Sequence, residues 1–370
     1  MEIKVSEKTV RVPVDRLRAI YAAVAAAHGA DADERAIFAD CLLRADFRGH
    51  PTQGVGLLAY LDELFEGGTM RFGGRLSILK ESASVAALDG GGNSGHVNAT
   101  RAMRIAIAKA KETGIGYATV RNTGDCGMAA NYSVQAVEAG LVGVAMATGP
   151  VLVAPWGGRE AQFCTNPISL AVPAGAREPI VIDMATSAES MGSTVLAARD
   201  KRRLSGLHVV TADGEYTDDA GRVILDALDR ESKMAGALLP AGPKGFGMVL
   251  MVELLSALMS GERWGPEGAE TAAGADRTDK KRGRSAHYAH ALIAISVEHF
   301  MPRAAFLSAV DRMIETLVSS PPAKGFDAVR LPGQGTRARE ADYRAKGVPV
   351  RPEEWAQVER VVAARGIAAP

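Results

Sequence analysis

Short apolar runs alternate with longer amphipathic segments in residues 84–147, SVAALDGGGNSGHVNATRAMRIAIAKAKETGIGYATVRNTGDCGMAANYSVQAVEAGLVGVAMA. Short apolar runs are typical of strands, and apolar residues at three- and four-residue spacing are typical of helices. Strands that alternate with helices in this way indicate an α/β domain. The pattern predicts strands at residues 85–88, 115–120 and 142–147, and helices at residues 98–113 and 130–139.

The flanking sequence divides the chain into helical ends and a mixed centre. We expect a helical segment at residues 1–80 that packs with C-terminal helices at residues 305–370, and an α/β domain at residues 81–304. Within that domain, residues 261–285 are polar and predict a mobile surface loop. The other predicted strands are residues 168–172, 180–184 and 291–296, and the other helices are residues 14–28, 31–45, 57–65, 242–259, 304–318 and 352–365.

Composition excludes several classes of protein. The chain has 370 residues with 43 Lys and Arg against 43 Asp and Glu, so it lacks the net positive charge of a nucleic-acid-binding protein. Three cysteines are too few for a disulfide framework and predict a reducing compartment. Residues 1–18 lack the apolar core of a signal peptide, and the apolar run at residues 248–259 is too short to span a bilayer. We expect a cytoplasmic protein with neither a nucleic-acid nor a membrane partner.

Residues 90–95, GGGNSG, match the dinucleotide-binding pattern G-x-G-x-x-G between a predicted strand and a predicted helix. The acidic residue that a Rossmann domain places after the next strand is missing, and Arg121 and Asn122 stand there instead. Because an arginine there can accept the 2′-phosphate of NADP, two interpretations remain open. The glycines are either a cofactor fingerprint or a tight turn.

Residues 238–247, LLPAGPKGFG, place small residues and Lys244 at the start of a predicted helix. Free N–H groups and the helix dipole favour an anion there, and the ammonium adds a positive charge. The alternative is a glycine-rich turn with a solvated lysine. No Ser or Thr follows the lysine, which excludes a Walker A loop.

Polar residues also stand at the ends of predicted strands, as Asp183 and Thr165 do. Ligands tend to bind at such ends in an α/β sheet, although turn capping explains the same residues equally well. No metal site is predicted, because only His287 and His290 approach ligand spacing and their place at the loop edge favours a solvated pair. No motif supports covalent catalysis.

Taken in order, several motifs resemble those of the malate/L-lactate dehydrogenase family, which also includes ureidoglycolate, sulfolactate, diketogulonate and cyclic imino acid oxidoreductases. The resemblance covers nearly the whole chain except the polar loop. The matching motifs are residues 48–56 (RGHPTQGVG), 154–158 (APWGG), 165–168 (TNPI), 183–187 (DMATS), 238–261 and 319–327 (SSPPAKGFD).

The resemblance implies a homodimer with a non-Rossmann NAD(P)-binding α/β fold that uses NAD or NADP to transfer hydride to a 2-oxo acid or a cyclic imine. It implies that residues 90–95 form a turn, because the family does not use that motif for its cofactor. It also implies cofactor contacts from three places: the end of the strand at residues 115–120, the DMATS segment and the lysine loop. The residues are Arg121, Asn122, Asp183, Met184, Ala185, Lys244 and Gly245.

The chain departs from the family at the catalytic positions. Family members carry Ser-His-Gly where residues 52–54 read TQG, and Asn-His-Phe-Gly where residues 124–127 read GDCG. Gln53 and Asp125 therefore replace two histidines, of which the second is the family's acid/base. Leu57 replaces the arginine that holds the substrate carboxylate in the family.

These substitutions change the expected chemistry. An aspartate is ionised at neutral pH unless burial raises its pKa, so Asp125 either donates a proton after such a shift or stabilises a cationic substrate. Without the arginine fork, a substrate carboxylate needs another anchor, such as Arg48 or the Lys244 loop. We assign catalysis to Asp125, Gln53 and Thr52, and substrate contacts to Arg48, His50, Leu57 and Thr165.

Three functions remain open from the sequence. The first is an NAD(P)-dependent oxidoreductase acting on an atypical 2-oxo acid, imine or amide-bearing small molecule. The second is a cofactor-binding dimer that has lost dehydrogenase activity, and the third is a lyase or hydrolase built on the same pocket. The retained cofactor motifs favour the first over the third, whereas the replaced histidines and arginine favour the second and third over an ordinary malate or lactate enzyme.

Overall fold

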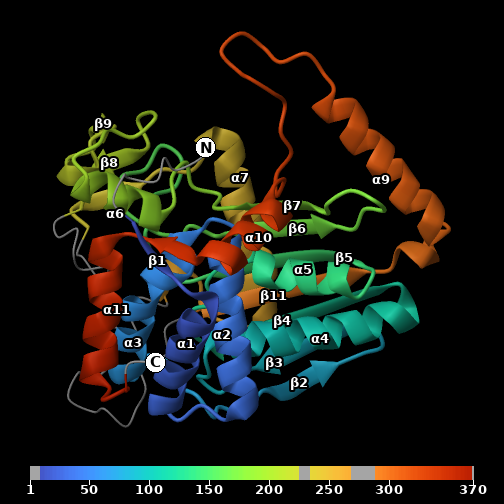
Figure 1. Ribbon diagram of the computed structural model, residues 1–370, viewed down its shortest axis with the longest axis horizontal. Helices are drawn as coiled ribbons and strands as arrows, with labels where there is room; N and C mark the ends of the chain where they lie inside the picture. The colour runs from blue at the N-terminus through green and yellow to red at the C-terminus, as the bar shows by residue number, and fades with distance from the viewer. Residues whose placement is uncertain (1–8, 225–233, 268–287, 369–370) are drawn as a thin grey trace.

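The computed structural model describes residues 9–224, 234–267 and 288–368, and most of the predicted polar loop lies outside them. Its centre is a seven-stranded sheet with the strand order β2-β3-β4-β11-β5-β6-β7 (Figure 1). Only β3 and β4 are parallel neighbours in this sheet. The mixed α/β class is confirmed. The strands are β2 (Ser77–Glu81), β3 (Val85–Asp89), β4 (Ile115–Thr123), β5 (Val142–Thr148), β6 (Ile168–Val172), β7 (Ile180–Met184) and β11 (Tyr288–Ile295).

Helices cover both faces of this sheet. Helices α4 and α5 pack on one face, and α7 with the π-helical turn η4 packs on the other (Figure 1). Of the N-terminal helices, α2 packs against α4 and α5, and all three contact α10 or α11. The bounds are α1 (Val14–Ala27), α2 (Ala32–Phe47), α3 (Leu58–Glu66), α4 (Gly95–Thr113), α5 (Ala130–Glu138), α6 (Met191–Arg199), α7 (Gly242–Glu253), η4 (Leu254–Leu258), α9 (Arg303–Val318), α10 (Thr336–Lys346) and α11 (Pro352–Ala364).

The two faces follow from side-chain alternation along the strands. In β4, Ala118 and Val120 belong to the large core that α4 closes, whereas Tyr117 faces η4 and donates a hydrogen bond to the carbonyl of Leu255. In β5, Ala145 lies in the first core and Met146 in the second. This period of two explains why the central strands are almost wholly apolar: both of their faces are buried.

Two smaller sheets complete the fold. The first is β10-β8-β9, and a separate core lies between it, α6 and α7. The second joins the two ends of the chain, because β1 pairs with β12. The division into residues 1–80 with 305–370 and residues 81–304 stays a prediction. Their bounds are β1 (Val10–Val12), β8 (Val209–Thr211), β9 (Tyr216–Thr217), β10 (Gly236–Leu238) and β12 (Val348–Val350).

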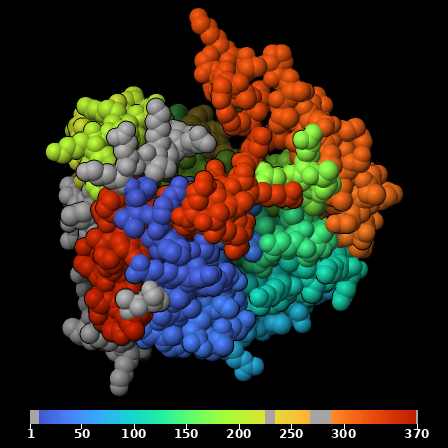
Figure 2. Space-filling view, viewed as in Figure 1, coloured from blue at the N-terminus to red at the C-terminus, as the bar shows by residue number. Residues whose placement is uncertain are grey.

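Helix α9 and residues 319–331 project from the body (Figures 1 and 2). Asp311 of α9 accepts hydrogen bonds from the backbone N–H groups of Gly175, Ala176 and Arg177, in the connection between β6 and β7. The predicted C-terminal helices therefore do not lie together: α10 and α11 contact the N-terminal helices, and α9 contacts the far edge of the sheet.

Close packing at the start of α7 depends on a glycine. A Cβ atom on Gly245 would lie 2.7 Å from the Cβ of Ala241 and 3.0 Å from the carbonyl oxygen of Thr186. Two residues further along the same helix, a Cβ on Gly247 would meet nothing within 4 Å. The two glycines therefore form a matched pair, one constrained by packing and one free.

We expect Gly245→Ala to lower the free energy of unfolding by about 1–3 kcal/mol, the usual cost of overpacking a close contact. Gly247→Ala should raise it by roughly 0.5–1 kcal/mol, because alanine loses less backbone entropy in a helix. Urea denaturation of both variants checks this. Equal effects of the two substitutions would contradict the packing described for α7.

Candidate functional site

One edge of the central sheet carries most of the predicted site segments. Strands β3, β4, β5 and β7 end at this edge, and β6 and β11 begin there. The DMATS segment, the TNPI segment and the loop with Asp125 are therefore neighbours in space although they are far apart in sequence. The strand residues that meet at this edge are Asp89, Thr123, Tyr288, Thr148, Ile168 and Met184.

Thr186 joins the DMATS segment to the lysine loop. Its hydroxyl donates to the carbonyls of Thr165 and Asn166, both at 3.0 Å, and its own carbonyl accepts the N–H of Ala241 at 3.0 Å. Thr186 is fully buried, so these bonds are protected from water. They place the first turn of α7 directly beside the end of β7.

Several groups beside Thr186 face outward or lack a partner. Lys244 is exposed in the first turn of α7, and Met184 is 42% exposed at the end of β7. Two buried oxygens at the same edge, Oγ1 of Thr148 and Oδ1 of Asn166, accept no hydrogen bond from the described residues. Ala185 is half-buried between these groups. A helix N-terminus, a lysine and unpaired polar atoms fit an elongated ligand that carries phosphate and amide groups.

Arg121 and Asn122 lie elsewhere on this edge. Their side chains donate to Asp89 at 3.3 Å and 2.9 Å, and the N–H of Asn122 donates to Glu262 at 2.9 Å. The ends of β4 and β7 are four strand spacings apart, about 19 Å. The predicted cofactor residues therefore form two groups. One lies at the start of α7, and the other, Arg121 and Asn122, lies near the residues that follow η4.

Asp183 is a half-buried acid at the end of β7. Desolvation raises the pKa of its carboxyl to about 6, although a hydrogen bond from the N–H of Ala130 (3.1 Å) and the charge of Arg48 lower it. A pKa of about 6 allows the group both to hold and to release a proton near neutral pH. The sequence predicted a cofactor contact for Asp183 and offered no signal for this shift.

Arg48 is the cation of this region. Burial lowers its pKa, and Asp183 is among the acids that raise it. Its Nε is buried and has no hydrogen-bond partner among the described residues, so the guanidinium keeps a donor for a ligand. His50, two residues later, is exposed.

Asp125 follows β4 and lies within electrostatic range of several buried side chains. Its Oδ1 accepts the N–H of Gly127 at 2.6 Å. Burial raises the pKa of Cys126 first, and the charges of Asp125 and Asp183 raise it further, so this thiol lies near both carboxylates. Burial likewise raises the pKa of Tyr288, with further contributions from Tyr60 and Asp125.

The hydroxyls of Tyr60 and Tyr288 are 3.3 Å apart. Tyr60 lies on α3 and Tyr288 begins β11, so this contact joins the N-terminal helices to the sheet edge near Asp125. Sequence reasoning missed both tyrosines. A separation of 228 residues leaves no local signal that could have found the pair.

A buried acid, Asp46, accepts a hydrogen bond from the turn that carries the predicted catalytic residues Thr52 and Gln53. Oδ1 of Asp46 accepts the N–H of Val55 at 2.9 Å, and Oδ2 accepts the hydroxyl of Tyr21 at 2.8 Å. Burial raises the pKa of Asp46 to about 7. A Cβ on Gly54 would lie 2.1 Å from Oδ1 of Asp46, so only glycine fits at that position.

This turn consists of the short helices η1 (Pro51–Gln53) and η2 (Val55–Leu57). Thr52 lies against Gly192 at the start of α6, and Gln53 is half-buried beside it. Leu57 is 3% exposed in the main hydrophobic core, so its side chain faces the interior and offers no surface to a substrate. The structure thus assembles Arg48, Asp183 and Asp125 at the sheet edge and leaves Leu57 out.

Two histidines pack under the Asp125 loop. His96 and His290 are buried, at 0% and 1% exposure, and burial lowers the pKa of each to about 3. A Cβ on Gly127 would lie 2.7 Å from Nε2 of His96. The prediction that His290 is solvated was wrong, because it belongs to β11 within the sheet; His287 lies outside the described residues.

No cluster of three or more His, Cys, Asp or Glu side chains in the described ranges is arranged to hold a metal ion. None of the helices in these ranges combines the length and apolar character needed to cross a membrane.

The sequence profile of the malate/L-lactate dehydrogenase family matches residues 12–359. A malate dehydrogenase of Pyrococcus abyssi is 32% identical over 98% of both chains, and an L-sulfolactate dehydrogenase of Methanocaldococcus jannaschii is 31% identical over 83% of both. The solved structure of a malate dehydrogenase from Pyrococcus horikoshii superposes with a TM-score of 0.84, at 29% identity, over 98% of each chain. These relatives are oxidoreductases. The chain therefore belongs to the malate/L-lactate dehydrogenase family.

Proposed function

We propose that this protein is an NAD(P)-dependent oxidoreductase that transfers hydride to a small substrate with a C=N or C=O bond and a cationic or amide group near it. One observation carries the proposal. Asp183 accepts a hydrogen bond from the N–H of Ala130, the residue at which the loop with Asp125 enters α5, so that loop reaches from the end of β4 to Asp183. Two carboxylates at the reacting end favour a substrate that is positively charged when bound.

The residues beside Thr186 fit a nicotinamide dinucleotide. Lys244 and the first turn of α7 offer positive charge for a pyrophosphate, and the unpaired Oγ1 of Thr148 and Oδ1 of Asn166 offer acceptors for an amide. Asp183, Met184, Ala185 and Gly245 would line the same path. When bound, the reduced cofactor supplies the hydride. Arg121 and Asn122 are four strands away and would contact only its far end.

Asp183 supplies the proton in this proposal. Its carboxyl, with a pKa of about 6, is the acid whose range suits proton transfer near neutral pH. Arg48 lies close enough to influence that pKa and keeps an unpaired donor, so it can hold a substrate carboxylate or carbonyl. Thr52 and Gln53 would hydrogen-bond the substrate, and His50 and Thr165 would border it.

Asp125 selects the substrate by charge. A carboxylate in place of a histidine stabilises an iminium or ammonium group and repels a carboxylate at close range. At an effective dielectric near 20, two unit charges 4 Å apart interact by about 4 kcal/mol. Malate and L-lactate are therefore expected to be poor substrates, and cyclic or open imino acids better ones.

We also propose a homodimer. The projecting α9 arm supports it, because Phe300 is 77% exposed before the helix and Phe326 is 71% exposed after it. Exposed aromatic side chains on a projecting segment are typical of surfaces that another chain covers.

Lys244→Ala should weaken binding of NADH or NADPH by about 10- to 100-fold, because a charge-assisted hydrogen bond to phosphate is lost. Titration of cofactor fluorescence with both dinucleotides measures this. Lys80→Ala is the matched control, since Lys80 is an exposed lysine on β2, at the opposite end of the sheet from β7. If neither cofactor binds the unaltered protein, the oxidoreductase proposal fails.

Asp125→Asn should lower the rate of reduction of a cationic substrate by up to roughly a thousandfold, the rate equivalent of the lost charge interaction of about 4 kcal/mol, while cofactor affinity stays unchanged. Asparagine keeps the acceptor for the N–H of Gly127, so folding should survive. With Asp183 as the acid, the rate of reduction should fall as pH rises through about 6, because the protonated form is then lost. Asp183→Asn should be slow and should lack that pH dependence.

A panel of imino acids, 2-oxo acids, malate and L-lactate, measured from pH 5 to 8, checks both variants. Rapid malate turnover in the unaltered protein, or an unchanged rate in Asp125→Asn, would overturn the roles given to the two carboxylates. Cofactor binding without turnover of any compound would favour a binding protein that has lost catalysis.

A further inference from the structure

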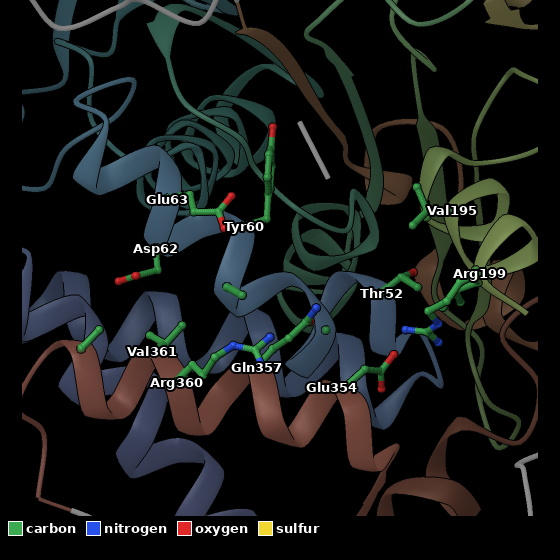
Figure 3. A pocket seen from close by; sticks show the side chains of 15 residues that line it. Thr52, Tyr60, Asp62, Glu63, Val195, Arg199, Glu354, Gln357, Arg360 and Val361 are labelled. Atoms are coloured by element: carbon green, nitrogen blue, oxygen red, sulfur yellow. The ribbon is translucent and has the colours of Figure 1, made fainter. Parts of the chain in front are cut away.

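A cavity lies beside the turn that carries Thr52, between α3, α6 and α11 (Figure 3). Its volume is about 260 Å³, slightly below the roughly 300–1,000 Å³ of pockets for drug-sized ligands. Ala59, Val195 and Val361 form an apolar part of its wall. A cavity of this size and lining suits a metabolite of amino-acid size.

Glu354 contributes a buried carboxylate to this cavity. The residue is 5% exposed, and its side chain extends from α11 toward Thr52 (Figure 3). Burial raises its pKa, while Arg351 and Arg199 lower it. Neither cation pairs with it directly: among the described residues, Arg351 pairs with Asp200 and Arg199 pairs with Asp200 and Glu353. The backbone of Arg351 donates a hydrogen bond to this carboxylate, but no side chain of the described residues forms an ion pair with it, so a ligand cation would add the ion pair that it lacks.

A guanidinium stands about one and two-thirds turns further along α11. Arg360 is exposed at the rim, and its side chain extends into the space between α11 and α3 (Figure 3). Gln357 lies between Glu354 and Arg360 and adds an amide. Six residues separate Glu354 from Arg360, which is about 9 Å along a helix axis. The cavity therefore presents Glu354 and Arg360 several bonds apart, and Asp62, Glu63 and Arg199 are further charged residues of its wall, together with apolar side chains.

We propose that this cavity binds an amino acid whose ammonium and carboxylate are separated by several methylene groups, with the ammonium on Glu354 and the carboxylate on Arg360. The site is distinct from the sheet edge that carries Asp125 and Asp183. It shares Thr52 with the predicted catalytic turn, so an occupant would also restrain that turn. The proposal does not rest on the oxidoreductase activity.

Calorimetric titration of the full chain without cofactor tests the charge spacing. The probes are 5-aminopentanoate and 6-aminohexanoate, compared with pentanoate, pentylamine and glycine. We expect the two long amino acids to bind at least about tenfold more tightly than the singly charged compounds, because each charged end gains a charge-assisted bond. Glycine should bind no better than pentanoate, because its charges are too close together to reach both ends.

Three variants locate the ligand. Glu354→Gln and Arg360→Gln should each weaken the long amino acids about tenfold or more, and Glu359→Gln, an exposed acid of the same helix outside the cavity, should have no effect. Glu354→Gln should leave pentanoate binding unchanged. Because Arg360 is exposed, Arg360→Gln keeps the test valid even if Glu354→Gln unfolds.

Absence of binding by both long amino acids would overturn the proposal, and so would binding that Arg360→Gln leaves unchanged. Asp125→Asn separates this site from the proposed active site. Binding that survives Asp125→Asn supports a second site whether or not the protein reduces any substrate. Binding that is lost in Asp125→Asn would show that the ligand occupies the site at the sheet edge instead.

Discussion

The hydrogen bonds of Thr186 hold the candidate site together. One buried side chain binds the carbonyls of Thr165 and Asn166, and its own carbonyl binds Ala241, so the ends of β6 and β7 and the start of α7 are fixed in one place. The close approach that these bonds require leaves no room for a side chain on Gly245. Together with the bond from Asn166 to the carbonyl of Val249, they set the position of Lys244 relative to Asp183. The proposed cofactor path therefore depends on a threonine that need not touch the cofactor.

The chemistry of the candidate site depends on which of its charged side chains are buried. Asp183 is desolvated enough to carry a proton near neutral pH. Arg48 keeps an unpaired donor, and Leu57 lies in the hydrophobic core. In the proposed site two carboxylates, Asp125 and Asp183, lie with one cation, Arg48. A substrate with a positively charged nitrogen suits this balance.

The fold was largely predictable because its central strands and most of its helices carry strong local patterns. The sequence did not reveal β2, whose residues are all exposed, nor α10, which is almost wholly polar, because neither has an apolar period. The same limit applies to the site. Motif order brought out Asp125, Asp183 and Lys244, but the pKa of Asp183 and the contact between Tyr60 and Tyr288 arise only from packing between distant segments. His290 was misplaced for that reason as well.

A crystal structure of the protein with NADH or NADPH tests the central claim most directly. The account predicts the pyrophosphate at the first turn of α7 beside Lys244, and the nicotinamide ring at the sheet edge within reach of both Asp125 and Asp183. A dinucleotide bound instead along residues 90–95, with its phosphates against that glycine turn, would contradict the account. So would a nicotinamide ring from which the carboxylates of Asp125 and Asp183 point away.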